Sequence, residues 1–175
     1  HGQAVNVEAR RAFLFNVMAQ AEVKNFPKEW ESALAKALAN PQLDESTKLA
    51  AIGVIQSRGL SGVDTALNGL VNDAKTSPAL RLAALGAAAL RVKTVSREVE
   101  RFLRDQHSST QPATRRSAAA RVTGQLAWSN AQRLRIAKGW MTEADGLTWP
   151  LLLSAFKNSN DEAVGFALVK QRVGH

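Results

Sequence analysis

Nine basic side chains in the middle of the chain have the types and spacing to bind an anionic ligand. Arg97, Arg101 and Arg104 follow i, i+4, i+7 spacing, which places them on one face of a helix. The other six lie on the next two predicted helices: Arg115, Arg116, Arg121, Arg133, Arg135 and Lys138. Such groups bind phosphates, acidic lipids or acidic protein surfaces. These nine residues are therefore the candidate interaction surface of the chain. A solvated face, or caps on the carbonyls of neighbouring helices, are the other roles that such residues take.

The excess positive charge is confined to this region. The formal net charge is +8, and residues 81–138 hold twelve Lys or Arg against three acids. Trp128 and Trp140 bracket the basic helix between them. Aromatic and cationic side chains together bind single-stranded bases, whereas tryptophans of a helical array more often pack in the core. Both roles stay open for this pair.

Paired carboxylates are the candidates for general acid and base chemistry. They occur at Asp44 with Glu45, Glu143 with Asp145, and Asp161 with Glu162. Each pair lies at or just before a predicted helix start, where a carboxylate accepts free backbone N–H groups. We therefore interpret all three pairs as helix caps.

The sequence has few residues that could bind a metal or cofactor or act as a nucleophile. The chain has no cysteine, which excludes disulfides, thiolate metal sites and covalent haem attachment within it. The histidines are His1, His107 and His175; His107 is expected in a polar loop after a helix. No phosphate-binding loop or nucleophile elbow is present. We expect no catalytic constellation, no metal site and no cofactor, and Asp105 with His107 would be the candidates if the chain were an enzyme.

Helical spacing of apolar residues runs through the chain, and strand alternation is nearly absent. This predicts an all-α fold. We expect an N-terminal helix over 8–22 and an extra helix over 130–140. No segment reads as a membrane span.

One helical segment recurs along the chain. Its copies are STKLAAIGVIQS (46–57), PALRLAALGAAALRV (78–92), PATRRSAAARVTGQ (112–125) and DEAVGFALVKQRV (161–173). With the shorter helices between them they predict four helix pairs, at 29–60, 62–92, 95–125 and 147–173. A period of about 33–47 residues built from helix pairs is typical of an α-solenoid, with a four-helix bundle as the alternative. Alanines and glycines in the second helices let neighbouring helices approach closely, and Leu82 and Leu85 fill the remaining gaps.

Local signals mark where these helices begin and end. Ser46 and Ser77 are expected N-caps, and Pro78 and Pro112 are expected in first helical turns. Gly59 is expected at a turn, and Gly124 at a helix end.

The recurring pattern P-x-x-R-x-x-A-A-x-x-x-A in the second helix resembles HEAT repeats. The basic position is Lys48, Arg81 and Arg115, and the fourth copy departs with Val164. The resemblance covers roughly residues 29–173. It implies one domain over 1–175, an α-α superhelix of the HEAT/armadillo-like kind with about four helix pairs plus the extra helix.

A narrower resemblance concerns GLTWPLLLSAFKNSNDEAVGFALVKQ (146–171). This segment is similar to the helical part of large planctomycete-type membrane-bound dehydrogenases, which lies between a propeller-like dehydrogenase domain and a haem-binding cytochrome c domain. The resemblance implies that the chain is a spacer from a longer protein, in the periplasm or secreted; without it a cytoplasmic location is expected.

These observations lead to one main functional hypothesis. We expect a non-catalytic scaffold or protein-interaction module, whose partner is another protein or the flanking domains of its own chain. The alternative is a nucleic-acid-binding helical array that uses the basic region of residues 81–138.

Overall fold

The computed structural model describes residues 10, 13–15, 17–20 and 26–173. In this part of the chain every regular element is a helix and there is no strand, which confirms the all-α prediction. The chain divides into two compact units, His1–Ala88 and Ala89–His175, called here the first and second unit. The described part of the predicted helix 8–22 is helical; the rest of that segment, His1 and His175 lie outside the described residues. None of the described helices has the length and hydrophobicity needed to cross a bilayer.

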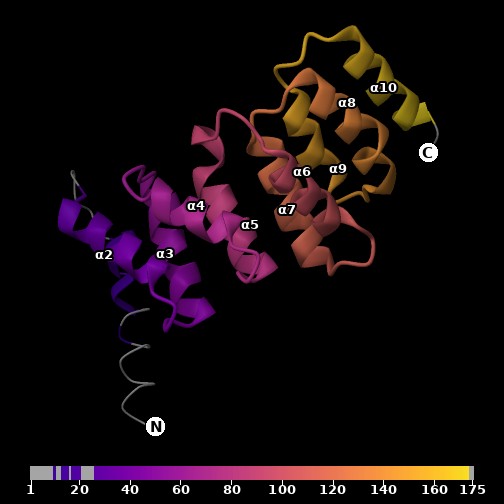
Figure 1. The fold of residues 1–175 in the computed structure, drawn as a ribbon. Helices are drawn as coiled ribbons and strands as arrows, with labels where there is room; N and C mark the ends of the chain where they lie inside the picture. Colours follow the sequence, from indigo (N-terminus) through magenta and orange to yellow (C-terminus); the bar gives the residue numbers. More distant parts are fainter. Residues whose placement is uncertain (1–9, 11–12, 16, 21–25, 174–175) are drawn as a thin grey trace. The chain divides into compact units, whose positions relative to one another are not determined.

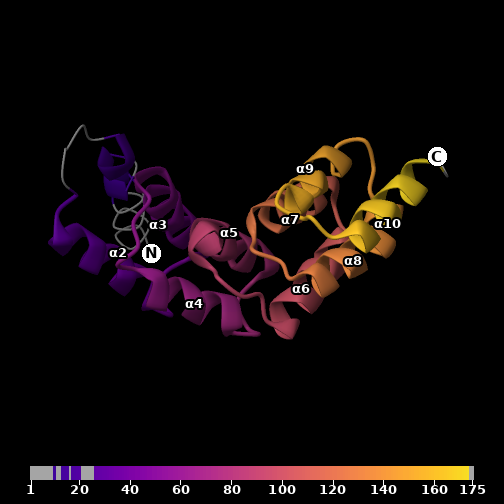
Figure 2. The ribbon, with the colours of Figure 1, turned by 90° about the horizontal axis from the view of Figure 1, so that it is seen from above.

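The first unit consists of two stacked helical hairpins (Figure 1). Its helices are α2 (Lys28–Ala39), α3 (Glu45–Arg58), α4 (Asp64–Asn72) and α5 (Pro78–Ala88). Helix α2 packs against α3 and α4, and helix α5 packs against α4 and α3. Thus α2 and α4 form one layer and α3 and α5 the other, as Figure 2 shows. The repeated segment 46–57 and residues 78–88 of its next copy therefore lie side by side as predicted, which is consistent with a superhelix.

Helix α5 shows why its sequence is rich in small residues. Ala84, Ala87 and Ala88 are buried where α5 packs against its two neighbours. Leu82 and Leu85 are each only 3% exposed, in agreement with the predicted space-filling role. Small side chains let helix axes approach closely, and the leucines supply the buried apolar area that stabilises the contact.

Helix ends in the first unit confirm some of the expected caps and correct one. Ser77 caps α5 through a 3.2 Å hydrogen bond from the Leu80 N–H, and Pro78 is the first residue of that helix. Gly59 ends α3 with φ 62°, a left-handed conformation that favours glycine. Ser46 is not the N-cap of α3, because Asp44 accepts the Thr47 N–H at 2.6 Å and the Ser46 hydroxyl donates to Asp44.

The second unit contains one helical hairpin, with a short helical turn before it and further helices after it. Its elements are η1 (Ala89–Arg91), α6 (Arg97–His107), α7 (Ala113–Gln125), α8 (Asn130–Lys138), η2 (Trp140–Glu143), α9 (Trp149–Leu153), η3 (Ser154–Phe156) and α10 (Glu162–Val173). The hairpin is α6–α7. Helix α8 is the predicted extra helix. Pro112 immediately precedes α7, one residue before the expected first turn.

The extra helix α8 has a packing partner of its own in the second unit. Helix α7 packs against α9 and η3, and helix α10 packs against α8 (Figure 2). The segment 161–173 therefore lies beside the extra helix, and α9 lies beside α7. That one repeat runs through all 175 residues stays a prediction.

Close contact between α7 and α9 depends on Gly124. This glycine lies in the last turn of α7, and a Cβ atom there would overlap the Leu151 carbonyl oxygen and touch the Ser154 side chain. Gly124 is thus a point of close approach between two helices. The sequence placed it at the end of a helix, and α7 ends one residue later, at Gln125.

Candidate functional site

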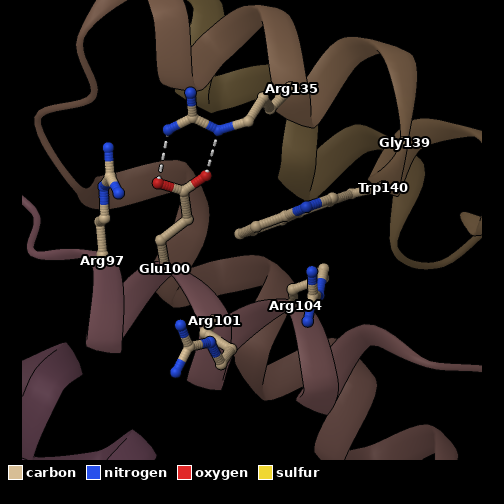
Figure 3. Close-up of a pocket in the computed structure, with 7 residues that line it drawn as sticks. All are labelled: Arg97, Glu100, Arg101, Arg104, Arg135, Gly139 and Trp140. Carbon is tan, nitrogen blue, oxygen red and sulfur yellow. Dashed lines mark hydrogen bonds and ion pairs between the residues drawn. The ribbon is translucent and has the colours of Figure 1, made fainter.

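A cleft of about 510 Å³ opens in the second unit between α6 and the α8–η2 segment (Figure 3). We call it the arginine cleft. Its lining residues are Arg97, Glu100, Arg101, Arg104, Arg135, Gly139 and Trp140. Four guanidinium groups and one carboxylate give this lining a net charge of +3.

Glu100 and Arg135 form a fixed ion pair across the cleft (Figure 3). Arg135 donates from Nε to Glu100 Oε1 at 2.6 Å and from Nη2 to Oε2 at 2.7 Å. Gln132 adds a 3.1 Å hydrogen bond to Oε2 and donates also to the Val95 carbonyl oxygen. The Arg135 hydrogen bonds, with that of Gln132, lower the pKa of the Glu100 carboxyl against the opposing effect of burial. Glu100 is therefore ionised, and its charge is already compensated.

The three arginines of α6 line the opposite wall. Arg97, Arg101 and Arg104 all reach the cleft, which confirms that they share one face of the helix. All three are exposed, and in the part of the chain that the structure describes Arg97 and Arg101 make no hydrogen bond. Arg104 contacts Asp105 at 3.3 Å, but both side chains are more than half exposed, so this pair adds little. The wall therefore presents exposed guanidinium groups, whose charged neighbours on α6 are the exposed Glu98 and Asp105.

The five remaining predicted residues lie outside the cleft. Arg115 donates to Gln111 at 2.8 Å, and Arg116 pairs with Asp145 at 2.6 Å. Arg133 donates to the Ala155 carbonyl oxygen at 3.0 Å, the carbonyl-capping role considered as an alternative. The last two, Arg121 and Lys138, are exposed at other positions of α7 and α8. The structure thus gathers four of the nine basic residues and uses three others in internal contacts.

Arg81, at the basic position of the recurring pattern, also donates to a backbone carbonyl oxygen, as Arg133 does. Its Nε donates to the Val71 carbonyl oxygen near the end of α4 at 3.0 Å. A guanidinium that satisfies a helix-terminal carbonyl joins the two helices of a hairpin. The recurring arginine therefore stabilises the fold of the first unit.

Trp140 forms the apolar wall of the arginine cleft and belongs to the core. It is 6% exposed and lies edge-to-face with Trp128, with ring centroids 5.7 Å apart. Trp128 is 3% exposed and donates its indole N–H to the Thr123 carbonyl oxygen at 2.7 Å. Neither ring presents an open face on which a base would stack, so both tryptophans have the core role.

His107 is buried, contrary to the expectation of a polar loop. It is the last residue of α6, and its Nε2 lies 3.1 Å from the Thr123 hydroxyl. Its ring packs against Trp140 with centroids 5.2 Å apart. Burial lowers the pKa of His107 to about 4, so the ring is neutral at physiological pH. The missed signal is its i, i+4 spacing from Leu103, which places both side chains on the buried face of α6.

In each carboxylate pair the aspartate accepts backbone N–H groups, the capping role that was expected of the pair. Asp161 accepts the Val164 N–H at 3.2 Å before α10, just as Asp44 caps α3. Asp145 accepts the Thr148 N–H at 2.9 Å ahead of α9, and hydrogen bonds from Thr148 lower the pKa of its carboxyl. Among the residues with described positions, no three His, Asp or Glu side chains gather to hold a metal ion.

The first unit has a groove of different character. It lies between α2 and α4, has a volume of about 620 Å³, and is lined mainly by apolar and small side chains. The charged residues of its lining are Lys36, Lys48 and Asp73, of mixed sign. The arginine cleft is therefore the site with the clearer chemical preference.

Comparison with known proteins identifies no relative: no family model matches the sequence, and neither a curated protein nor a solved structure is significantly similar to it.

Proposed function

We propose that the chain is a non-catalytic helical interaction module, of the HEAT-like kind, whose arginine cleft binds an acidic segment of a protein partner. The single observation that carries the proposal is the wall of three exposed arginines facing a fourth that Glu100 already holds. Clusters of arginines on rigid elements are a recurring means of recognising acidic motifs. A flanking domain of the same longer chain is one source of such a segment.

The compactness of the cluster favours an acidic protein segment over nucleic acid. Affinity for nucleic acid comes from many phosphate contacts along a strand, and single-stranded bases also need open aromatic faces. Here Arg116 and Arg133 are engaged in internal contacts, and Trp128 and Trp140 are core residues. The exposed basic residues of the cleft, Arg97, Arg101 and Arg104, form a compact group whose size suits a short acidic peptide segment.

Fluorescence anisotropy tests this proposal with the full chain. The probes are a labelled peptide rich in Asp and Glu, a neutral peptide of the same length, and a labelled single-stranded oligonucleotide. The test variant carries Arg97→Gln, Arg101→Gln and Arg104→Gln. The matched control carries Arg121→Gln, Lys138→Gln and Lys157→Gln, which removes the same charge from exposed positions outside the cleft.

We expect the acidic peptide to bind and the cleft variant to lose at least about tenfold in affinity, since hydrogen bonds to charged groups contribute about 1.5–3 kcal/mol each. The control variant should lose less than about threefold, because it changes only long-range charge. Equal losses in the two variants would contradict a specific site. Tighter binding of the oligonucleotide than of the peptide at physiological salt would favour the nucleic-acid alternative.

A further inference from the structure

The arginine cleft holds more positive charge than a single carboxylate balances. Glu100 is satisfied by Arg135 and Gln132. Arg97, Arg101 and Arg104 carry the remaining positive charge of the lining, with the exposed carboxylates Glu98 and Asp105 beside them on α6. A single Asp or Glu side chain brings one negative charge and two oxygens. A phosphate monoester brings about −1.5 to −2 at neutral pH and three strongly accepting oxygens. The charge of the cleft therefore fits a phosphoryl group better.

The residue types point the same way. All of the basic side chains that line the cleft are arginines. The guanidinium is a planar fork that donates two parallel hydrogen bonds to phosphate or carboxylate, whereas a lysine acts as a point charge. A surface selected only for solubility or general attraction would not need this geometry. The uniform choice of arginine indicates recognition of an oxyanion.

The placement of the three arginines allows them to act on one group. Along α6, Arg97 and Arg101 are separated by about 6 Å and Arg101 and Arg104 by about 4.5 Å, at 1.5 Å per residue. Their long, exposed side chains border one cleft, with Arg135 and Trp140 on the other side (Figure 3). Arg135 is 54% exposed, although Glu100 holds two of its nitrogens. Because Glu100 holds these two nitrogens, a tetrahedral anion in the cleft would take its donors from Arg97, Arg101 and Arg104.

We infer that the arginine cleft recognises a phosphorylated Ser, Thr or Tyr side chain in the partner segment, with Arg97, Arg101 and Arg104 as its ligands. This inference rests on the proposed function and adds the chemical identity of the group that is bound. The partner is accordingly a protein that a kinase modifies, and the modification controls docking.

Three labelled peptides of one acidic sequence test the inference, differing only at a central residue that is Ser, Glu or phosphoserine. We expect the full chain to bind the phosphoserine peptide at least about tenfold more tightly than the Glu peptide. The triple cleft variant (R97Q, R101Q, R104Q) should lose this preference, and the triple control variant (R121Q, K138Q, K157Q) should keep it. Inorganic phosphate, as competitor, should bind at least about tenfold more weakly than the phosphopeptide, because it lacks the flanking acidic contacts.

A pH series separates a phosphoryl ligand from a carboxylate ligand. The second ionisation of a phosphate monoester lies near pH 6, so affinity for the phosphopeptide should rise several-fold between about pH 5.5 and pH 7. The Glu peptide should show no such rise. The cleft's own charged groups are four arginines and Glu100, with Glu98 and Asp105 exposed nearby and neutral His107 behind Trp140. Hydrogen bonds lower the pKa of Glu98 and of Glu100, and burial lowers the pKa of His107 to about 4. These three groups therefore keep their protonation state across the series, and the rise belongs to the ligand.

The outcomes distinguish this inference from the proposed function. Equal affinity for the Glu and phosphoserine peptides would refute phosphoryl recognition and leave acidic docking intact. Inorganic phosphate binding as tightly as the phosphopeptide would show that the ligand is the free anion, which also refutes a phosphorylated partner. If no acidic peptide binds even at low salt, both the proposed function and the inference are wrong.

Discussion

Replacing Glu100 by Gln tests whether the arginine cleft is built on a real ion pair. The substitution keeps the size of the side chain and removes its charge. It also turns one acceptor oxygen into an NH₂ group that faces the donors of Arg135 or Gln132. Because Glu100 is buried, the lost contacts are not replaced by water.

The magnitude follows from the hydrogen bonds that Glu100 accepts. Two come from a charged guanidinium, and such bonds contribute about 1.5–3 kcal/mol each, against about 0.5–1.5 kcal/mol for neutral ones. Arg135 is 54% exposed, so solvent screening reduces this gain. We therefore expect the free energy of unfolding to fall by about 1–3 kcal/mol at neutral pH. The control Asp105→Asn breaks the exposed pair with Arg104 and should change stability by less than about 0.5 kcal/mol.

Urea unfolding followed by tryptophan fluorescence measures both variants, since Trp128 and Trp140 lie in the core of the second unit. The pKa of Glu100 is lowered in the folded state. Its stabilising contribution is therefore complete above its ordinary pKa of about 4.5 and disappears as the pH falls through the lowered value. The difference between wild type and Glu100→Gln should therefore shrink as the pH falls below 4.5. Equal destabilisation by Glu100→Gln and Asp105→Asn, or a difference independent of pH, would refute the reasoning.

Three further predictions concern the packing and the ends of the helices. Gly124→Ala should lower the free energy of unfolding by about 1–3 kcal/mol, because the added Cβ would collide with the Leu151 carbonyl oxygen. Gly69→Ala, where a Cβ on α4 meets open space, should raise it by about 0.4–1 kcal/mol. Thermal unfolding measures both variants, and effects of the same sign would contradict the close contact. The pKa of His107 is about 4 in the folded state, against an ordinary value of 6.5. Between pH 6.5 and about pH 4 the unfolded chain therefore binds a proton at this residue that the folded chain does not bind. The free energy of unfolding should thus fall by up to about 3 kcal/mol as the pH drops through that range. In urea titrations His107→Gln should depend less on pH than the wild type. The same dependence on pH in both proteins would contradict the burial of His107. Asp44→Ala should cost about 1 kcal/mol and Ser46→Ala clearly less, and equal losses in chemical denaturation would mean that the capping residue is assigned wrongly.

Features set by local sequence were predicted well. The helical period gave the positions of α3, α5 and α8, and the recurrence of small residues gave the packing of α3 against α5. The spacing of Arg97, Arg101 and Arg104 placed them correctly on one face. Each of these depends on residues within a few turns of one another, where spacing alone decides which side chains share a face.

Features set by contacts between distant residues were not predictable. Arg135 meets Glu100 across 35 positions of sequence, and no local pattern selects this partner from the other arginines. The packing of α9 on α7 and of α10 on α8 depends in the same way on contacts between distant residues, which no local pattern specifies. His107 was assigned to a loop on the polarity of its neighbours, although α6 extends far enough to bury it.

The most direct test of the central claim, that the arginine cleft is where an acidic ligand binds, is chemical-shift mapping by NMR. A ¹⁵N-labelled full chain is titrated with the Asp- and Glu-rich peptide, and the four tryptophan indole signals are assigned by Trp→Phe variants. We expect the Trp140 indole signal and the amide signals around Arg97–Arg104 to shift together, while the Trp30 signal of the first unit does not move. Shifts concentrated in the groove between α2 and α4, with Trp140 unchanged, would contradict it.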